Sequence, residues 1–392
     1  MTEQDVAEAG PALLASALMR NGALSSDWLP AFHAAPRHRF VPETIWPGAA
    51  GGNRQKNRVI RSEEPRAWWE AVYSDAPITT QWDDGAHVGP EKGSIPTSSN
   101  SMPTMVFSML RALDVSEGHR VLEIGTGTGW NAALLSSHVG PADVVTIEVD
   151  HTTAEAARER LQDAGFLPLV VVGDGAAGYV QGAPYDRLIA TCSIGRVPYA
   201  WIEQMKPGGV LVAPWGPTYG GEAFVRLTAT GDGTAQGKFL GSSAFMRLRA
   251  QRTERKHVRE YLKGKPWPAD GARSTTALSP DDVGDWPIMF AVGVQVGDAF
   301  PWMESYKDGS YTLWLRDTAV TSWATADFEK DRREFEVVQS GPRRLWDEVE
   351  RAYQWWQSQG RPVFDRFGLT VTPEGETVWL DDPQNPIPPS RG

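Results

Sequence analysis

The sequence predicts an α/β protein, with a doubly wound parallel sheet followed by a smaller α+β domain. Five short apolar runs recur between Arg120 and Gly216, and helix-like segments separate the first three of them. This strand and helix alternation is typical of a parallel sheet that helices cover on both faces. The chain has 392 residues, a length that suggests two domains at ordinary domain sizes.

Each apolar run is predicted to be a buried strand: RVLEIG, DVVTIEVD, PLVVVGDG, YDRLIATCS and GGVLVAPWG. Helices are expected at residues 131–139 and 152–164, and Gly165 suits the end of the second. Ligands of such sheets bind beyond the carboxyl ends of the strands, so the glycine-rich turn after the first run is the expected site.

Composition narrows the function classes. A single cysteine, Cys192, and seven scattered histidines lead us to expect neither a disulfide framework nor a metal site. The net charge of −11 argues against nucleic-acid binding, and the absence of a long apolar stretch or secretory signal predicts a cytoplasmic protein without membrane insertion. One basic segment, residues 247–265, could face an acidic partner, although a solvated helix or linker is the favoured interpretation.

The glycine-rich turn lies in RVLEIGTGTGWNAALL, residues 120–135. Trp130 occupies the position where a dinucleotide fingerprint needs its third glycine, so a nicotinamide cofactor fits poorly. With Glu123 the segment reads E-x-G-x-G-x-G, the pattern of S-adenosylmethionine-dependent methyltransferases. Glycines there let backbone N–H groups approach a bulky ligand closely.

Two acidic residues at later strand ends support the same cofactor. Glu148 closes the second strand and could accept both ribose hydroxyls, unless it is only an exposed strand-end carboxylate. Asp174 could accept a hydrogen bond from the adenine amino group, unless it only forms an Asp-Gly turn. We therefore predict S-adenosylmethionine as cofactor and S-adenosylhomocysteine as product. The predicted cofactor-binding residues are Glu123, Gly125, Thr126, Gly127, Gly129, Glu148, Val149, Asp174 and Gly175.

Several motifs together resemble the protein-L-isoaspartate (D-aspartate) O-methyltransferase family: HRFVP, YSDAP, SMP, VLEIGTGTGWNAALL, GDG, APYDRLIATCS and MKPGG. The resemblance spans about residues 10–249, which gives a predicted methyltransferase domain of residues 1–250. It implies the class I, Rossmann-like methyltransferase fold. It also implies transfer of a methyl group to an aspartyl or isoaspartyl carboxylate in a peptide.

The substrate region departs from that family. After Pro77 comes an extended segment, in which only Ser101 and Pro103 align with the family's serine and proline. Residues 43–101 are long, aromatic and rich in glycine and proline, and we expect an irregular, peptide-binding segment. Ser101 is the predicted catalytic residue, which orients the substrate carboxylate, caps the following helix, or does both. Asp75 could shape the substrate loop or only form an Asx-turn. The predicted substrate contacts are Tyr73, Asp75, Ser99, Asn100 and Ser101.

Residues 251–392 hold nine of the 17 tryptophans. They resemble the C-terminal extension of methyltransferases that modify ribosomally made peptides, and could recognise a precursor peptide or merely brace the catalytic domain. Here a helix ending near Gly360 and a hairpin around TPEGE are expected. The apolar face of the helix is predicted to be core rather than a ligand groove. It comprises Leu345, Trp346, Val349, Tyr353 and Trp356.

The favoured function is methylation of an aspartate in a modified precursor peptide, with the ester closing to an aspartimide that in some cases opens to isoaspartate. General isoaspartyl repair is the alternative. A peptide-binding module on a degenerate methyltransferase fold and a nicotinamide oxidoreductase are weaker ones. A monomer is favoured.

Overall fold

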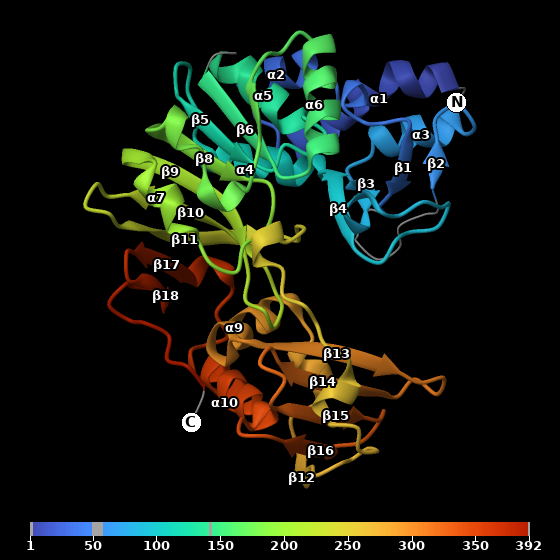
Figure 1. The fold of residues 1–392 in the computed structure, drawn as a ribbon, viewed down its shortest axis with the longest axis vertical. Coiled ribbons are helices and arrows are strands. Elements are labelled where there is room, and N and C mark those ends of the chain that lie inside the picture. The colour runs from blue at the N-terminus through green and yellow to red at the C-terminus, as the bar shows by residue number, and fades with distance from the viewer. Residues whose placement is uncertain (1–2, 49–57, 141–142, 391–392) are drawn as a thin grey trace.

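A nine-stranded sheet forms the centre of the molecule (Figure 1). The computed structural model describes residues 3–48, 58–140 and 143–390. The strand order is β18-β17-β11-β10-β9-β8-β5-β6-β7, and the five strands from β9 to β7 are parallel, as predicted. These five are β5 (Val121–Ile124), β6 (Val144–Glu148), β7 (Leu169–Val172), β8 (Tyr185–Ala190) and β9 (Met205–Trp215). The chain reverses its direction of winding between β5 and β8, so their carboxyl ends flank the switch point of the sheet.

Four antiparallel strands extend the sheet beyond β9: β10 (Ala223–Ala229), β11 (Ala235–Ser242), β17 (Phe367–Thr372) and β18 (Gly375–Leu380). The last two are the predicted hairpin around TPEGE. The predicted domain boundary after residue 250 does not hold for these two strands. β17 pairs with β11 of the predicted methyltransferase domain, from Ala235↔Val371 to Lys238↔Gly368. The C-terminus therefore returns to the central sheet, where the unpaired edge of β11 offers backbone hydrogen bonds.

Helices cover both faces of the parallel strands. They include α4 (Pro103–Leu113), α5 (Trp130–Val139), α6 (His151–Asp163) and α7 (Tyr199–Glu203). The faces alternate along each strand as the period of two requires: Val121 packs in the core beneath α4 and α5, whereas Leu122 packs with Trp201 of α7. The predicted helices at 131–139 and 152–164 are α5 and α6, and Gly165 follows α6 with a φ of 86°. No helix in residues 3–48, 58–140 or 143–390 is long and apolar enough to span a membrane.

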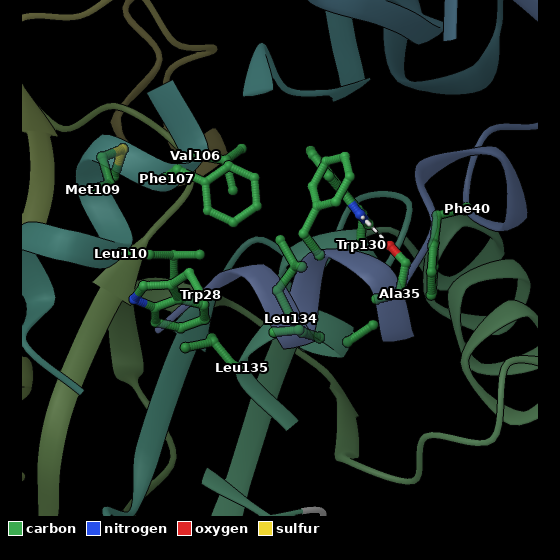
Figure 2. Packing of buried hydrophobic residues seen from close by; sticks show 14 of the residues in the cluster. Trp28, Ala35, Phe40, Val106, Phe107, Met109, Leu110, Trp130, Leu134 and Leu135 are labelled. Carbon is green, nitrogen blue, oxygen red and sulfur yellow. Dashed lines mark hydrogen bonds between the residues drawn. The ribbon is translucent and has the colours of Figure 1, made fainter. Parts of the chain in front are cut away.

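The N-terminal helices α1 (Glu3–Arg20) and α2 (Leu29–Ala34) join this core. Figure 2 shows Trp28, Phe107 and Trp130 packed between α2, α4 and α5. The Trp130 indole N–H donates to the Ala35 carbonyl at 2.9 Å, and its ring meets Phe107 edge-on at 6.1 Å. Trp130, which replaces the third glycine of a dinucleotide fingerprint, thus fixes the start of α5 against the N-terminal segment.

Residues 43–101 are more regular than expected. They form α3 (Pro65–Val72) and an antiparallel sheet in the order β2-β1-β3-β4, which lies to the right in Figure 1. Its strands are β1 (Thr44–Pro47), β2 (Val59–Ile60), β3 (Ile78–Trp82) and β4 (Pro96–Asn100). Polar strands such as β4 (PTSSN) carry little apolar signal, so the sequence pattern missed them. Part of the glycine-rich stretch, residues 49–57, lies outside the described residues.

The C-terminal region contains a five-stranded antiparallel sheet in the order β12-β16-β15-β14-β13. Its elements are α9 (Trp286–Val296), α10 (Leu345–Ser358), β12 (Ala272–Thr276), β13 (Ala299–Ser305), β14 (Tyr311–Asp317), β15 (Trp323–Phe328) and β16 (Phe335–Ser340). The predicted apolar face of α10 is core. Leu345, Trp346 and Val349 are almost fully buried with α9 and the sheet, and Trp356 packs in the core of the central sheet.

An aromatic junction joins this region to the central sheet. Phe290 of α9 packs against Trp215, Phe239 and Phe367, with ring centroids 5.0–5.8 Å apart. Gly221 lies directly beneath α9, where any Cβ would collide with the backbone of Phe290. The two sheets are therefore held together by close packing on both sides of α9.

Candidate active site

A cleft of about 1320 Å³ opens at the carboxyl ends of β5 and β8. It is lined by the glycine turn after β5, by Thr191 and Cys192 after β8, by β4, and by residues 244–255. Phe300 of β13 closes it from the C-terminal sheet. Small-molecule sites usually have about 300–1,000 Å³, so this cleft has room for a cofactor and part of a second ligand.

The glycine turn forms a cradle that side chains would fill. Gly125, Gly127 and Gly129 have φ angles of 98°, 53° and 91°, a region that favours glycine. A Cβ on Gly125 would lie 2.8 Å from the Thr191 hydroxyl oxygen, and one on Gly127 would lie 3.3 Å from the Ser99 carbonyl oxygen. Gly125, Thr126 and Gly127 line the cleft, whereas Gly129 lies against Leu161 of α6 and serves helix packing.

Glu148 lies at the end of β6 and lines the cleft, as predicted. One carboxylate oxygen accepts the Gly127 N–H at 2.9 Å, and the other accepts the Asp150 N–H at 3.1 Å. A carboxylate has about four acceptor positions, so two remain for a diol. Burial raises the pKa of Glu148 above its ordinary value, against the lowering effect of these backbone N–H groups. The site thus holds a partly desolvated, oriented acceptor.

Glu123 does not line the cleft, which corrects its predicted contact with the cofactor. It is fully buried behind the turn and accepts hydrogen bonds from Asn131 Nδ2 at 2.7 Å and Thr146 Oγ1 at 2.6 Å. The Thr146 hydroxyl lies 2.7 Å from that of Thr126. Each hydroxyl has one proton, so Thr126 donates to Thr146 when Thr146 donates to Glu123. Burial raises the pKa of Glu123 to about 7, and the residue braces the turn from below.

Of the other predicted cofactor-binding residues, two line the cleft and one does not. Val149 and Gly175 line the cleft. Asp174 is exposed, stands outside the lining, and accepts the Ala176 N–H at 2.9 Å as the cap of a short 3-10 turn. The alternative interpretation of Asp174 as an Asp-Gly turn therefore describes its observed contact, and an adenine contact stays a prediction.

Ser99, Asn100 and Ser101 line the cleft at the end of β4. The Ser101 hydroxyl has no hydrogen-bond partner among residues 3–48, 58–140 and 143–390. Its expected second role as a helix cap is wrong: Met102 is the N-cap of α4, and within the described residues the Ser101 hydroxyl accepts no N–H of this helix. Asn100 is committed to the protein, because its amide donates to Thr128 Oγ1 at 2.9 Å and its side-chain oxygen accepts from Arg37. Among the described residues, the hydroxyls of Ser99 and Ser101 are therefore both free at this edge of the cleft.

Arg37 organises this strand and was missed by sequence analysis. Its guanidinium is 1 % exposed and donates to Asn100 Oδ1 at 2.6 Å. It also donates, at 2.9–3.2 Å, to the backbone carbonyls of Val72, Ser74, Ala76, Asn100 and Ser101. Burial lowers the pKa of Arg37 to about 9. The chain Arg37–Asn100–Thr128 connects the substrate strand to the glycine turn.

Tyr73 and Asp75 lie outside the cleft lining, which corrects their predicted place among the substrate contacts. The Tyr73 hydroxyl lies 2.6 Å from His38 Nδ1, and burial raises the pKa of Tyr73 to about 12. Asp75 accepts the Thr104 N–H at 2.9 Å and the Thr104 hydroxyl at 2.6 Å, which tethers the first turn of α4. Asp75 thus holds the start of the helix that follows Ser101.

Comparisons with known proteins agree on one family. A profile described as Protein-L-isoaspartate(D-aspartate) O-methyltransferase (PCMT) matches residues 57–253. The protein-L-isoaspartate O-methyltransferase of Thermococcus onnurineus (strain NA1) is 36 % identical over 197 residues, 50 % of this chain and 89 % of the relative. That of Ignicoccus hospitalis is 42 % identical over 142 residues, 36 % and 67 % of the two chains. A solved structure of a protein-L-isoaspartate O-methyltransferase is 20 % identical, and the alignment covers 95 % of this chain and 100 % of that chain, with a TM-score of 0.52.

Proposed function

Since the chain belongs to the protein-L-isoaspartate O-methyltransferase family, we propose that it methylates an aspartyl side-chain carboxylate in a ribosomally made, post-translationally modified peptide. The resulting ester closes to an aspartimide. The enzyme is an S-adenosylmethionine-dependent methyltransferase. The observation that carries the proposed substrate is the wide cleft between β4 and Phe300, which joins the cofactor turn to a rebuilt substrate segment.

The residues of the cleft fit the cofactor. A Cβ at Gly125 would collide with the Thr191 hydroxyl, so the turn leaves room for a ligand only with glycine there. The Glu148 carboxylate keeps free acceptor positions for ribose hydroxyls. Bound S-adenosylmethionine supplies an electrophilic methyl group. The Glu148 carboxylate would accept hydrogen bonds from its ribose hydroxyls, and Gly125, Gly127, Val149 and Gly175 would line its surroundings.

The peptide carboxylate needs orientation rather than a base. An aspartate with an ordinary pKa near 4 is ionised at neutral pH and is already a nucleophile. The free Ser101 hydroxyl can donate to one carboxylate oxygen and leave the other directed toward the methyl donor. Arg37 holds the Ser101 carbonyl and thereby fixes this hydroxyl in place. Fixed geometry of this kind is the main source of acceleration for such a transfer.

The ester then changes the chemistry of the peptide. Methoxide is a far better leaving group than oxide, so the following backbone nitrogen attacks the ester carbonyl. A C–N bond forms, the C–OCH₃ bond breaks, and methanol leaves with the amide proton. This closure needs no further group from the enzyme.

General isoaspartyl repair is the second candidate, and the family match favours it. In repair the methylated carboxylate is the α-carboxylate of an isoaspartyl residue. The C-terminal extension does not decide between the two, because the structural alignment with a protein-L-isoaspartate O-methyltransferase covers 95 % of this chain. The decision therefore depends on the substrate.

Intact-mass spectrometry of two peptides tests the proposal. One is a linear isoaspartyl peptide, and the other is the cross-linked, aspartate-containing precursor encoded nearest the enzyme's own gene. The proposal expects methylation of the precursor alone, followed by loss of methanol. Methylation of the linear isoaspartyl peptide alone would establish repair instead. Ser94→Ala serves as a matched control for Ser101→Ala, because Ser94 lies on the same hairpin but outside the cleft lining.

A further inference from the structure

We propose that Arg247 and Arg255 form an anion-binding subsite that recognises an acidic residue beside the target residue of the peptide substrate. The inference rests on the proposed function and specifies its substrate class: a peptide with carboxylates next to the methylated position. It concerns the basic segment that sequence analysis singled out in an otherwise acidic chain.

The first part of this basic segment, residues 247–255, contributes a wall of the active-site cleft, whereas residues 256–265 lie outside the lining. Arg247, Arg249, Arg252 and Arg255 all line the same cleft as the glycine turn and Ser101. Backbone hydrogen bonds fix its beginning, where Ser193 N donates to the Met246 carbonyl and Leu248 N donates to the Ser193 carbonyl, both at 2.8 Å. Four guanidinium groups thus border the space where a peptide meets the methyl donor.

Two of these arginines already have carboxylate partners. Arg249 lies 2.8 Å from Asp84 Oδ1 and 3.7 Å from Asp150, and Arg252 lies 2.9 Å from Asp84. Asp84 is on the turn between β3 and β4, so this pair fastens the substrate hairpin over the cleft. Their charges are compensated within the protein.

Arg247 and Arg255 have no such partner. Within the described parts of the chain neither forms an ion pair, and Arg247 Nη1 donates only to the Gly216 carbonyl at 3.2 Å. Of the acidic groups, Glu222 has the largest electrostatic effect on the pKa of Arg247. Its Oε1 already accepts hydrogen bonds from Ser243 Oγ at 3.0 Å and Phe245 N at 2.9 Å. Arg255 lies over the Phe300 ring at 5.2 Å. Stacking leaves the N–H edge of a guanidinium available for hydrogen bonds.

The two guanidinium groups line the same cleft and repel each other. Burial is the main cause that lowers the pKa of Arg247, and the charge of Arg255 lowers it further. An anion placed between them would relieve this repulsion and gain charge-assisted hydrogen bonds in a partly desolvated site. A carboxylate matches the fork geometry of arginine, so an aspartate or glutamate of the peptide is the fitting ligand.

Fluorescence anisotropy with non-reactive peptides tests the subsite directly. The probes are two labelled peptides in which asparagine replaces the target aspartate, one with glutamates on both sides and one with glutamines there. They are titrated with the enzyme saturated with S-adenosylhomocysteine. We expect the wild type to bind the glutamate peptide at least tenfold more tightly, and this preference to shrink as salt rises.

The double variant Arg247→Gln, Arg255→Gln should lose this preference while keeping its affinity for S-adenosylhomocysteine. Arg255→Gln alone should lose most of the preference for the glutamate peptide. Because Arg255 is exposed, this single variant keeps the test valid if the double variant folds poorly. Arg259→Gln removes the same charge from an exposed residue outside the cleft lining and should retain the full preference. Equal binding of both peptides by the wild type, or an unchanged preference in Arg255→Gln and the double variant, would overturn the subsite.

Mass spectrometry with the target aspartate restored separates this proposal from the proposed function. Preferential binding of the glutamate peptide, together with no methylation of the cross-linked precursor, supports the subsite and contradicts the proposed function. Equal binding and equal methylation of both peptides contradicts the subsite and leaves the proposed function standing.

Discussion

Replacing Arg37 by methionine should destabilise the protein more than any change at the rim of the cleft. Methionine fills similar space but donates no hydrogen bond, so five backbone carbonyls and Asn100 Oδ1 lose their donor inside the protein. Each unsatisfied buried acceptor costs about 1–3 kcal/mol, and some relaxation or water entry offsets part of that cost. We expect a loss of about 3–5 kcal/mol in the free energy of unfolding.

Chemical denaturation followed by tryptophan fluorescence measures this loss. Arg37→Lys keeps the charge with three donors in place of five, so its stability should lie between those of wild type and Arg37→Met. Arg39→Met, on the same 3-10 turn but exposed, is the matched control and should change stability little. Hydrogen exchange should accelerate in residues 72–76 and 98–101 of Arg37→Met. A denaturation midpoint equal to that of wild type would refute the assigned role of this guanidinium.

Three further predictions concern the cleft. Ser101→Ala should slow methyl transfer and leave S-adenosylhomocysteine affinity unchanged, as steady-state kinetics and calorimetry will show; full activity would remove Ser101 from the mechanism. Glu148→Ala should weaken S-adenosylhomocysteine binding by about 1–3 kcal/mol in calorimetry, whereas Glu155→Ala, which removes a half-exposed carboxylate of α6, should not. Glu123 binds its proton more tightly in the native state, with a pKa of about 7, than in the unfolded chain. Its contribution to stability should therefore fall by about 3 kcal/mol as pH rises from about 4.5 to about 7. In Glu123→Gln, chemical denaturation across this pH range should no longer show this decrease in the free energy of unfolding. If the free energy of unfolding depends on pH as it does in wild type, the raised pKa of Glu123 is contradicted.

The parallel strands were predictable because each run is short, rich in β-branched residues and bounded by turn residues. Their burial was predicted less well: β7 lies at the edge of the sheet, where Leu169 is 50 % and Val172 is 41 % exposed. The glycine turn was predictable as well, because glycine favours positive φ angles and Gly125, Gly127 and Gly129 all adopt them. Glu148 was found from its place at a strand end. These features share a local cause, because the signal for each lies within a few residues of the feature itself.

The remaining parts of the site depend on distant contacts. Nothing near Arg37 in the sequence distinguishes it from exposed Arg39; only the approach of residues 72–76 and 98–101 turns it into a buried donor. Glu123 and Asp174 both follow the motif pattern, yet one carboxylate lies behind the turn and the other points away to cap its own backbone. Spacing along the chain places a residue near a site, but the side-chain direction follows from packing.

The C-terminal half contributes to the cleft because it is attached twice. A domain joined by one linker can rotate about it, but here α9 packs on Gly221 and the β17–β18 hairpin pairs with β11. Glu376 of that hairpin, whose pKa burial raises, accepts the Val197 N–H at 2.9 Å and the Trp215 indole N–H at 3.1 Å. Two separate attachments therefore join the region that carries Phe300 to the central sheet, and packing at both of them determines the shape of the cleft in this structure.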